Sequence, residues 1–280
     1  MQKSFDVNGP AEIELRLAAG DITVDAALDG RVEFELRAED EESQRLVDDA
    51  TIELREHGGR PQIIVDVPNK RGFNLAGMFG RQGITCRVNC PPESGLSAKT
   101  KSADVTARGV LGGLNVQSAS GDVEADRVSG GANLKNASGD VTIREVGALS
   151  VQTASGDVDV QVARGPVNVN SASGDVSIGE AYDNVSVNTV SGDQDHGAVM
   201  RGNVAAHTVS GDVSIAVRRG SKVFLDCNTV SGDTRSDLEL SGDVPDGDGP
   251  LVEIRAKTVS GDIRITRAPA PSDSTQGVHA

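Results

Sequence analysis

Residues 149–160 read L-S-V-Q-T-A-S-G-D-V-D-V, and this short pattern decides the fold. Apolar and polar residues alternate on both sides of Ser155-Gly156-Asp157, with the two-residue period of half-buried strands. The tripeptide itself is typical of a tight corner, because Gly adopts positive φ at low cost and Ser and Asp bond nearby backbone N–H groups. One unit therefore predicts strand, corner, strand, corner, with no room for a helix.

The same corner recurs along most of the chain, at steps of 17–29 residues, most of them 17–19. A unit of this length cannot bury its own apolar face, whereas stacked copies can, each strand pairing with its equivalent about 4.8 Å away. We therefore predict an all-β chain, a single-stranded parallel β-helix of about nine coils over 96–267. We expect it to be right-handed, as parallel crossovers nearly always are. Ser-Gly-Asp stands at 120–122, 138–140, 155–157, 173–175, 191–193, 210–212, 231–233 and 260–262, after a degenerate Ser-Ala-Asp at 102–104.

Stacking places the corner aspartates in a column, where neighbouring carboxylates about 4.8 Å apart repel by about 1 kcal/mol in bulk water. An Asx-type corner, in which each Asp accepts backbone N–H bonds, is the favoured interpretation. Calcium between coils is an alternative, although one Gly per corner does not match the calcium-binding nonapeptide. A sugar-cleaving enzyme is less favoured, because regular copies single out no acid and second carboxylate. The column is Asp104, Asp122, Asp140, Asp157, Asp175, Asp193, Asp212, Asp233 and Asp262. A second column two residues before each Ser, mostly Thr and Ser, is predicted to point inward and satisfy corner backbone groups.

Composition limits the function classes. The 280 residues include 27 Lys and Arg against 42 Asp and Glu, a net charge of −15, and no basic stripe follows the repeats, so we expect no nucleic-acid partner. Neither a signal peptide nor a transmembrane segment is visible. Cys86, Cys90 and Cys227 are an odd count without disulfide spacing, so we expect a reduced, cytoplasmic protein. The four histidines share no metal spacing, and no catalytic residue, metal or cofactor is predicted: His57, His196, His207 and His279.

Residues 1–95 depart from the repeat and predict a β-rich cap with a short helix near 40–50, although residues 19–24 resemble an isolated repeat corner. A cap is expected because an exposed parallel edge would template aggregation. Its loop at 69–83 places Phe73, Leu75, Met78 and Phe79 among basic and Gly residues. We expect this loop to plug the end of the solenoid; the alternative is an exposed finger for a partner or a membrane surface.

The C-terminal coils are less regular. Residues 239–250 form an acidic insertion in which Asp243, Asp246 and Asp248 lack EF-hand spacing, so we expect a solvated loop, with a weak cation site as the alternative. Residues 268–280 are rich in Pro and small polar residues and predict a disordered tail.

The corners A-S-G-D-V and T-V-S-G-D-V, preceded by V-N-C-P-P-E-S-G-L-S-A-K-T, resemble the bacterial putative-adhesin β-strand-repeat family, domain-of-unknown-function family 4097. The resemblance covers roughly 84–267 and implies a parallel β-helix-like solenoid with no established activity. It supplies no catalytic residues.

We therefore expect a non-enzymatic, adhesin-like binding or scaffold module that presents a rigid acidic surface to a protein or polymer. The alternatives are a calcium-stabilised structural repeat protein and, less favoured, a polysaccharide-active β-helix enzyme. The oligomeric state is left open by the sequence.

Overall fold

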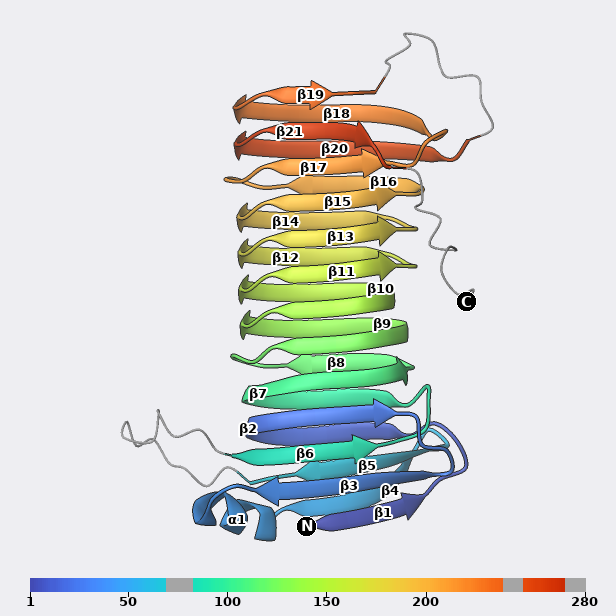
Figure 1. Ribbon diagram of the computed structural model, residues 1–280, viewed down its shortest axis with the longest axis vertical. Helices are drawn as coiled ribbons and strands as arrows, with labels where there is room; N and C mark the ends of the chain where they lie inside the picture. The colour runs from blue at the N-terminus through green and yellow to red at the C-terminus, as the bar shows by residue number, and fades with distance from the viewer. Residues whose placement is uncertain (69–82, 239–248, 270–280) are drawn as a thin grey trace, which may run out of the picture.

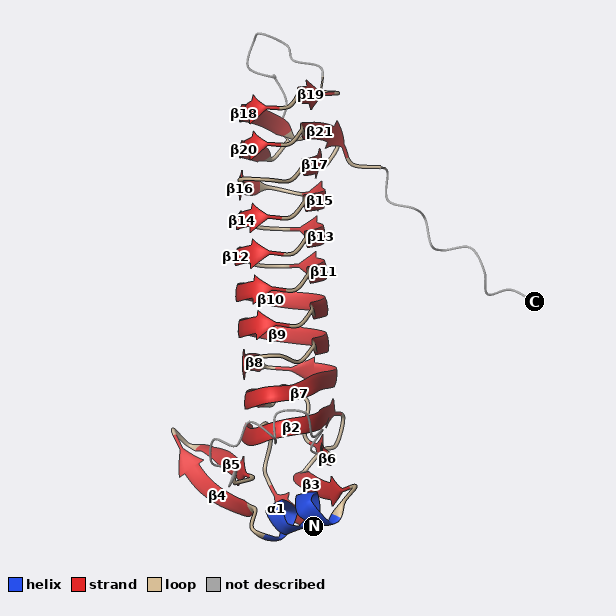
Figure 2. Ribbon diagram, turned by 90° about the vertical axis from the view of Figure 1, so that its left-hand side faces the viewer, coloured by secondary structure: helices blue, strands red, loops and turns tan. Residues whose placement is uncertain are grey.

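The computed structural model describes residues 1–68, 83–238 and 249–269 as an elongated stack of strands with one short helix at its base (Figure 1). Each coil contributes one strand before its Ser-Gly-Asp corner and one after it. The strands before the corners form one sheet, the pre-corner sheet, and those after them form the facing post-corner sheet (Figure 2). The all-β, solenoid-like architecture expected from the repeats is confirmed.

The strands of the central stack pair in parallel, each with its equivalent in the next coil. In β10, for example, Val141 faces Val158 after the corner and Leu149 faces Val167 before it. Long strands such as β9 and β10 continue around a bend and belong to both sheets. The strands are β7 (Gly95–Leu111), β8 (Gly113–Gln117), β9 (Val123–Ser138), β10 (Val141–Ser155), β11 (Val158–Ala163), β12 (Val167–Ser173), β13 (Val176–Ala181), β14 (Val185–Ser191), β15 (Gln194–Val199), β16 (Gly202–His207) and β17 (Val213–Val217).

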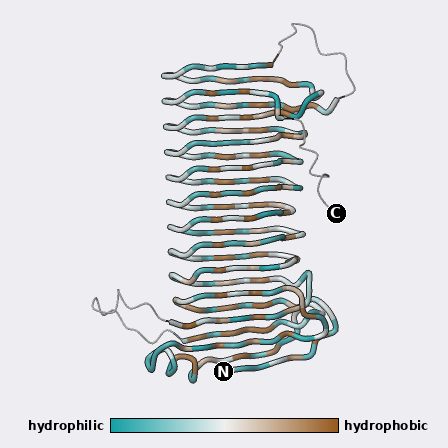
Figure 3. The backbone as a smooth tube through the Cα atoms, viewed as in Figure 1, coloured by the Kyte–Doolittle hydropathy of each residue, from teal (hydrophilic) through white to brown (hydrophobic). Residues whose placement is uncertain are grey.

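A narrow aliphatic core fills the space between the two sheets. Val151, Val169 and Ile143 are fully buried at inward positions, while the residues between them face solvent. Figure 3 shows this alternation of hydrophobic and hydrophilic residues along every coil. Burying each such side chain contributes roughly 1.5–3 kcal/mol, which offsets much of the entropy lost when a short coil is ordered.

The last two coils are not stacked in chain order. β16 pairs with β20 (Leu251–Ser260), which in turn pairs with β18 (Lys222–Ser231). After the corner, β17 likewise pairs with β21 (Ile263–Arg267), and β21 pairs with β19 (Thr234–Ser236). The chain thus builds the outermost coil first and then returns to fill the place beneath it (Figure 1). The 29-residue interval from Ser231 to Ser260, the longest between two Ser-Gly-Asp corners, includes the segment that leads from the outermost coil back to the coil beneath it.

The stack begins earlier than 96, which corrects the predicted boundary of the cap. β2 (Glu12–Ala26) is itself a complete coil, because its residues lie in parallel register with β7, Asp21 facing Asp104. The corner-like residues 19–24 are therefore a true corner. Below β2, its first half pairs with β5 (Arg60–Asp66) and its second half with β6 (Ile84–Asn89).

Antiparallel strands and a helix cover the base of the stack. β4 (Thr51–His57) pairs with β5, while β3 (Arg31–Ala38) pairs with β6 and with β1 (Gln2–Asp6). The two sheets diverge here, and α1 (Glu41–Asp48) lies between them with Val47 fully buried (Figure 2). Together these strands and α1 form a β-rich base below the coil of β2.

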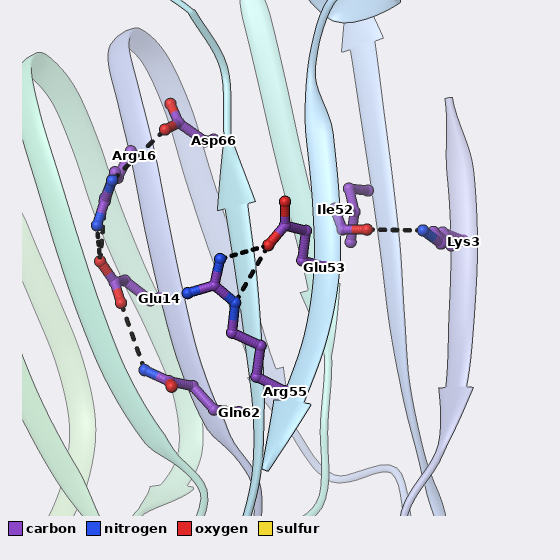
Figure 4. A network of polar contacts seen from close by, with 8 residues as sticks. All are labelled: Lys3, Glu14, Arg16, Ile52, Glu53, Arg55, Gln62 and Asp66. Carbon is purple, nitrogen blue, oxygen red and sulfur yellow. Dashed lines mark hydrogen bonds and ion pairs between the residues drawn. The ribbon is translucent and has the colours of Figure 1, made fainter. Parts of the chain in front are cut away.

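A polar network on the outside of the cap links its strands (Figure 4). Glu14 of β2 accepts from Arg16 and from Gln62 of β5, and Arg16 also contacts Asp66 at 3.5 Å. Lys3 Nζ of β1 donates to the carbonyl oxygen of Ile52 in β4 at 2.7 Å. That bond joins the two diverging sheets at their free edges.

Candidate binding surface

The corner aspartates form a continuous exposed column, here called the Asp ridge. In stack order it consists of Asp104, Asp122, Asp140, Asp157, Asp175, Asp193, Asp212, Asp262 and Asp233. Each carboxylate Oδ1 from Asp104 to Asp262 accepts the backbone N–H of the next aspartate in the stack, at 2.8–2.9 Å. Each Asp therefore bonds to the neighbouring coil and not within its own turn. One oxygen is fixed by this bond, which holds the charged groups at regular spacing along one edge of the molecule.

The residues behind the ridge keep adjacent corners close together. At Gly156, where φ is 129°, a Cβ atom would lie 2.2 Å from the carbonyl oxygen of Gly139. The inward column of hydroxyls and amides satisfies other corner carbonyls: Thr153 Oγ1 donates to Ser155 at 3.1 Å, and Asn136 Nδ2 donates to Gly139 at 3.1 Å. These contacts give the ridge a rigid support.

An apolar column runs beside the ridge on the last four coils. It consists of the residues directly before each Ser-Gly-Asp, in stack order Val190, Val209, Val259 and Val230. All four valines are exposed, Val230 to 82%. The equivalent residues in the four preceding coils are alanines, and the coil of Asp104 carries Lys101 there. This valine column and the Asp ridge together form a surface that is both acidic and apolar.

The outer face of the pre-corner sheet carries a shallow groove of about 590 Å³ across five coils. Small residues such as Gly131, Ala148 and Pro166 line it on one side, and Asn133 and Asn168 line it on the other. Beside it, Asn188 Nδ2 donates to Asn170 Oδ1 at 3.1 Å, and Asn170 donates to Asn168 at 2.9 Å. Sequence reasoning missed this amide column, although its two-residue and 18-residue spacings were visible.

Two polar side chains interrupt the core in β15. Gln194 and His196 are fully buried, and neither His196 nitrogen nor Gln194 Oε1 has a hydrogen-bond partner among the described residues. Burial lowers the pKa of His196 to about 4, so its imidazole is neutral at pH 7. Both residues occupy positions after the corner where the two adjacent coils carry Val and Ile, a signal that sequence reasoning did not use. Of the other histidines, His57 lies in β4, His207 lies in β16, and His279 falls outside the described residues.

Other predicted residues lie elsewhere. The loop residues Phe73, Leu75, Met78 and Phe79, and the acidic residues Asp243, Asp246 and Asp248, fall outside the described residues. Most of the predicted tail does too, but Ala268 is buried and donates its N–H to Val217. Within 1–68, 83–238 and 249–269, no cluster of His, Cys, Asp or Glu is suited to hold a metal ion. No helix in that part of the chain is long and apolar enough to cross a membrane.

The cysteines are free thiols, and their environments are inert. Cys86 and Cys90 are buried, and Cys227 is half-buried. Burial raises the pKa of Cys86 to about 12 and that of Cys90 to about 11. Both values lie well above the pH of a cell, so neither thiol forms a thiolate there. These two residues therefore act as small apolar side chains.

The stacked corners match a known family. The model of the Toastrack DUF4097 family matches residues 11–266. The chain belongs to this family. The resemblance seen in the repeated corners is thereby confirmed, and the match also includes the coil at β2. No curated protein matches this Toastrack sequence.

Several solved structures of bacterial proteins are similar to this chain. The Toastrack chain is similar to a putative adhesin from Bacteroides fragilis, with 15% identity, a TM-score of 0.48, and coverage of 95% of this chain and 96% of that one. It is also similar to a putative adhesin and to a putative lipid binding protein, both from Parabacteroides distasonis. Each is 13% identical and covers 94% of this chain and 96% of its own, with TM-scores of 0.44 and 0.46.

Proposed function

We propose that this Toastrack protein is a non-enzymatic, adhesin-like binding module whose contact surface is the Asp ridge with the adjoining valine column. The observation that carries the proposal is the column of exposed carboxylates, whose spacing is fixed by hydrogen bonds between neighbouring coils. A partner meeting this edge would need basic groups about 4.8 Å apart, together with apolar groups toward the C-terminal coils. A protein surface satisfies both requirements better than a uniform polymer does.

Neutralising the ridge without disturbing its hydrogen bonds tests the proposal. The variant Asp140→Asn/Asp157→Asn/Asp175→Asn keeps an Oδ1 acceptor in each of three successive coils and removes three charges. We expect it to weaken binding to poly-lysine, and to any protein captured from native lysate, by at least tenfold at low salt, with an unchanged melting temperature. The matched control Glu124→Gln/Asp159→Asn/Asp195→Asn removes three exposed charges from the post-corner sheet. Equal losses in both variants would argue against a specific role for the ridge.

A cation-stabilised structural role is the alternative. Calcium would bridge the outer carboxylate oxygens of neighbouring coils, but every inner oxygen from Asp104 to Asp262 is already occupied by a backbone N–H. Calorimetric titration with calcium separates the two functions, because a structural cation would bind with a stoichiometry near one per coil pair and raise the melting temperature. Screening against acidic and neutral polysaccharides tests the less favoured glycan-active enzyme.

We infer two further properties, the cellular location of the protein and the hand of its β-helix. The three cysteines are all free thiols, which supports a reducing compartment, and we infer a cytoplasmic location, which cell fractionation would test. We also infer that the stack is a right-handed parallel β-helix, supported by the parallel register of its coils and the strong handedness preference of parallel crossovers. A crystal structure would test the hand.

A further inference from the structure

The two ends of the stack differ. The base is covered by antiparallel strands and α1, whereas the outermost coil at the other end, here called the terminal coil, consists of β18 and β19. Among the described residues, β18 pairs with β20 alone and β19 with β21 alone. β18 is therefore a ten-residue edge strand with one row of backbone groups available for pairing.

The side chains of β18 show that the core continues to this end with no cover from the described residues. Val223, Leu225 and Cys227 point inward but are only half-buried. Their neighbours in register on β20, namely Val252, Ile254 and Ala256, are fully buried. On the outer face, Phe224 is 58% exposed. The terminal coil thus presents an apolar surface of the kind that usually contacts another chain.

The sequence of β18 is complementary to itself. Suppose that two copies of the strand pair in antiparallel fashion about a twofold axis at Phe224. Each residue then faces the residue of the other copy that lies equally far from Phe224 on the opposite side. Lys222 then faces Asp226 of the other copy, on the same outer side, and the two Phe224 rings meet at the axis. On the inner side, Val223 faces Leu225. Shifting the axis by two residues, to Asp226, would instead place two carboxylates opposite each other.

We propose that two copies of this chain join end to end through β18, in this register, to form a symmetric dimer. The twofold axis stands normal to the pre-corner sheet, so inward side chains stay inward and the sheet continues from one copy into the other. The interface is isologous, so each copy uses its β18 edge once and the assembly closes at two. This assembly does not rest on the proposed function, because no aspartate of the Asp ridge lies in β18.

Sedimentation of the full-length chain over a wide concentration range tests the dimer. We expect a reversible monomer–dimer equilibrium in the wild type. Lys222→Asp and Asp226→Lys should each weaken dimerisation at least tenfold, because each places like charges opposite each other. The double variant Lys222→Asp/Asp226→Lys should restore it, and so should an equimolar mixture of the two single variants. Lys135→Asp, an exposed charge reversal on the same sheet in mid-stack, is the matched control and should leave the equilibrium unchanged.

Hydrogen exchange of the β18 amides gives a second readout. In a dimer, their protection should rise with protein concentration. A wild-type chain that stays monomeric at every concentration would overturn the proposal, and protected β18 amides in that monomer would assign the edge to a segment of the same chain. A dimer that both single charge reversals leave intact would also overturn it, because the association would then use another surface.

Discussion

At the residue scale, the corner glycines control how closely two coils approach. Gly156 has a φ of 129°, a region that other residues rarely adopt, and its Cα faces the carbonyl oxygen of the coil below. The conformation and the close approach both exclude a side chain. An aspartate directly after each glycine can then reach the backbone N–H of the next coil.

Gly156→Ala should therefore destabilise the protein. The added Cβ would lie 2.2 Å from Gly139 O, so the backbone must shift in addition to the strain at positive φ. We expect a loss of about 1–3 kcal/mol in the free energy of unfolding, measured with denaturant, and a larger loss for Gly156→Val. Gly131→Ala is the control, since nothing lies within 4 Å of its Cβ position. Equal stability of the two alanine variants would contradict this account of the corner.

His196 makes stability depend on pH through its burial between coils. It lies in register between Ile178 and Ile215, and its pKa is lowered to about 4 by burial. The unfolded chain, with an ordinary histidine pKa near 6.5, binds a proton at a higher pH than the folded chain. The stability linked to neutral His196 is therefore fully present above pH 6.5 and is lost as pH falls toward 4.

His196→Ile should remove this dependence. We expect the variant to be more stable than the wild type at pH 7 by about 1–3 kcal/mol, because it replaces two buried nitrogens without partners by an aliphatic side chain. The difference should grow as pH falls from 6.5 to 4. Denaturant unfolding of both proteins at a series of pH values measures it, and carboxylates that titrate in both proteins cancel. A constant difference across this range would show that His196 titrates normally in the folded state.

At the scale of elements, α1 shows how the base of the stack is closed. Asp40 caps the helix by accepting the N–H of Ser43 at 2.7 Å, and Glu41 and Glu42 follow at its positive end. Val47 is fully buried between the diverging sheets. An eight-residue helix is too short to be stable alone, so its packing in this gap must hold it in place.

Val47→Ala should accordingly lower the free energy of unfolding by about 2 kcal/mol, the combined cost of lost burial and a small cavity. Thermal and denaturant unfolding would measure this. Leu54→Ala serves as the control, because Leu54 lies exposed on the neighbouring strand β4 and should change stability little. If Val47→Ala were equally mild, the helix would be a surface attachment and not a cover for the core.

At the scale of the whole molecule, the last two coils stack in an order that differs from their order in the chain. Ser210 forms a bridge with Ser260, and Ser260 lies in register with Ser231. The terminal coil is thus separated from β16 by a coil that comes later in the sequence. Such an excursion costs little, because the entropy of closing a loop grows slowly with its length.

Cysteine pairs test this order directly. Adjacent parallel strands place equivalent Cα atoms about 4.8 Å apart, within the range that a disulfide bridges, whereas two coils place them about 9.6 Å apart. We expect Ser210→Cys/Ser260→Cys to cross-link under mild oxidation and Ser210→Cys/Ser231→Cys not to, as judged by mass spectrometry of peptides. The reverse result would show that the coils stack in chain order.

The sequence by itself determined the repeating coil of this protein, which is a strand, a corner and a second strand. Alternating residues around Ser155-Gly156-Asp157 specify two half-buried strands and a corner, since strand periodicity and turn chemistry are local properties. The recurrence of that unit specifies a stack, and the stack aligns the aspartates and thus the candidate surface. The cap and its helix also followed from local pattern.

Only the tertiary structure decided which coil lies on which. The inward residues and corners of β18 and β20 are nearly equivalent, so either strand could pair with β16 by local criteria. For the same reason, the distant coil β2 could not be placed on β7 from its sequence. Partner choice among similar coils depends on contacts between residues far apart in the chain. Within the described part of the chain, those contacts also leave β18 at the edge of the sheet, a property that no single repeat contains.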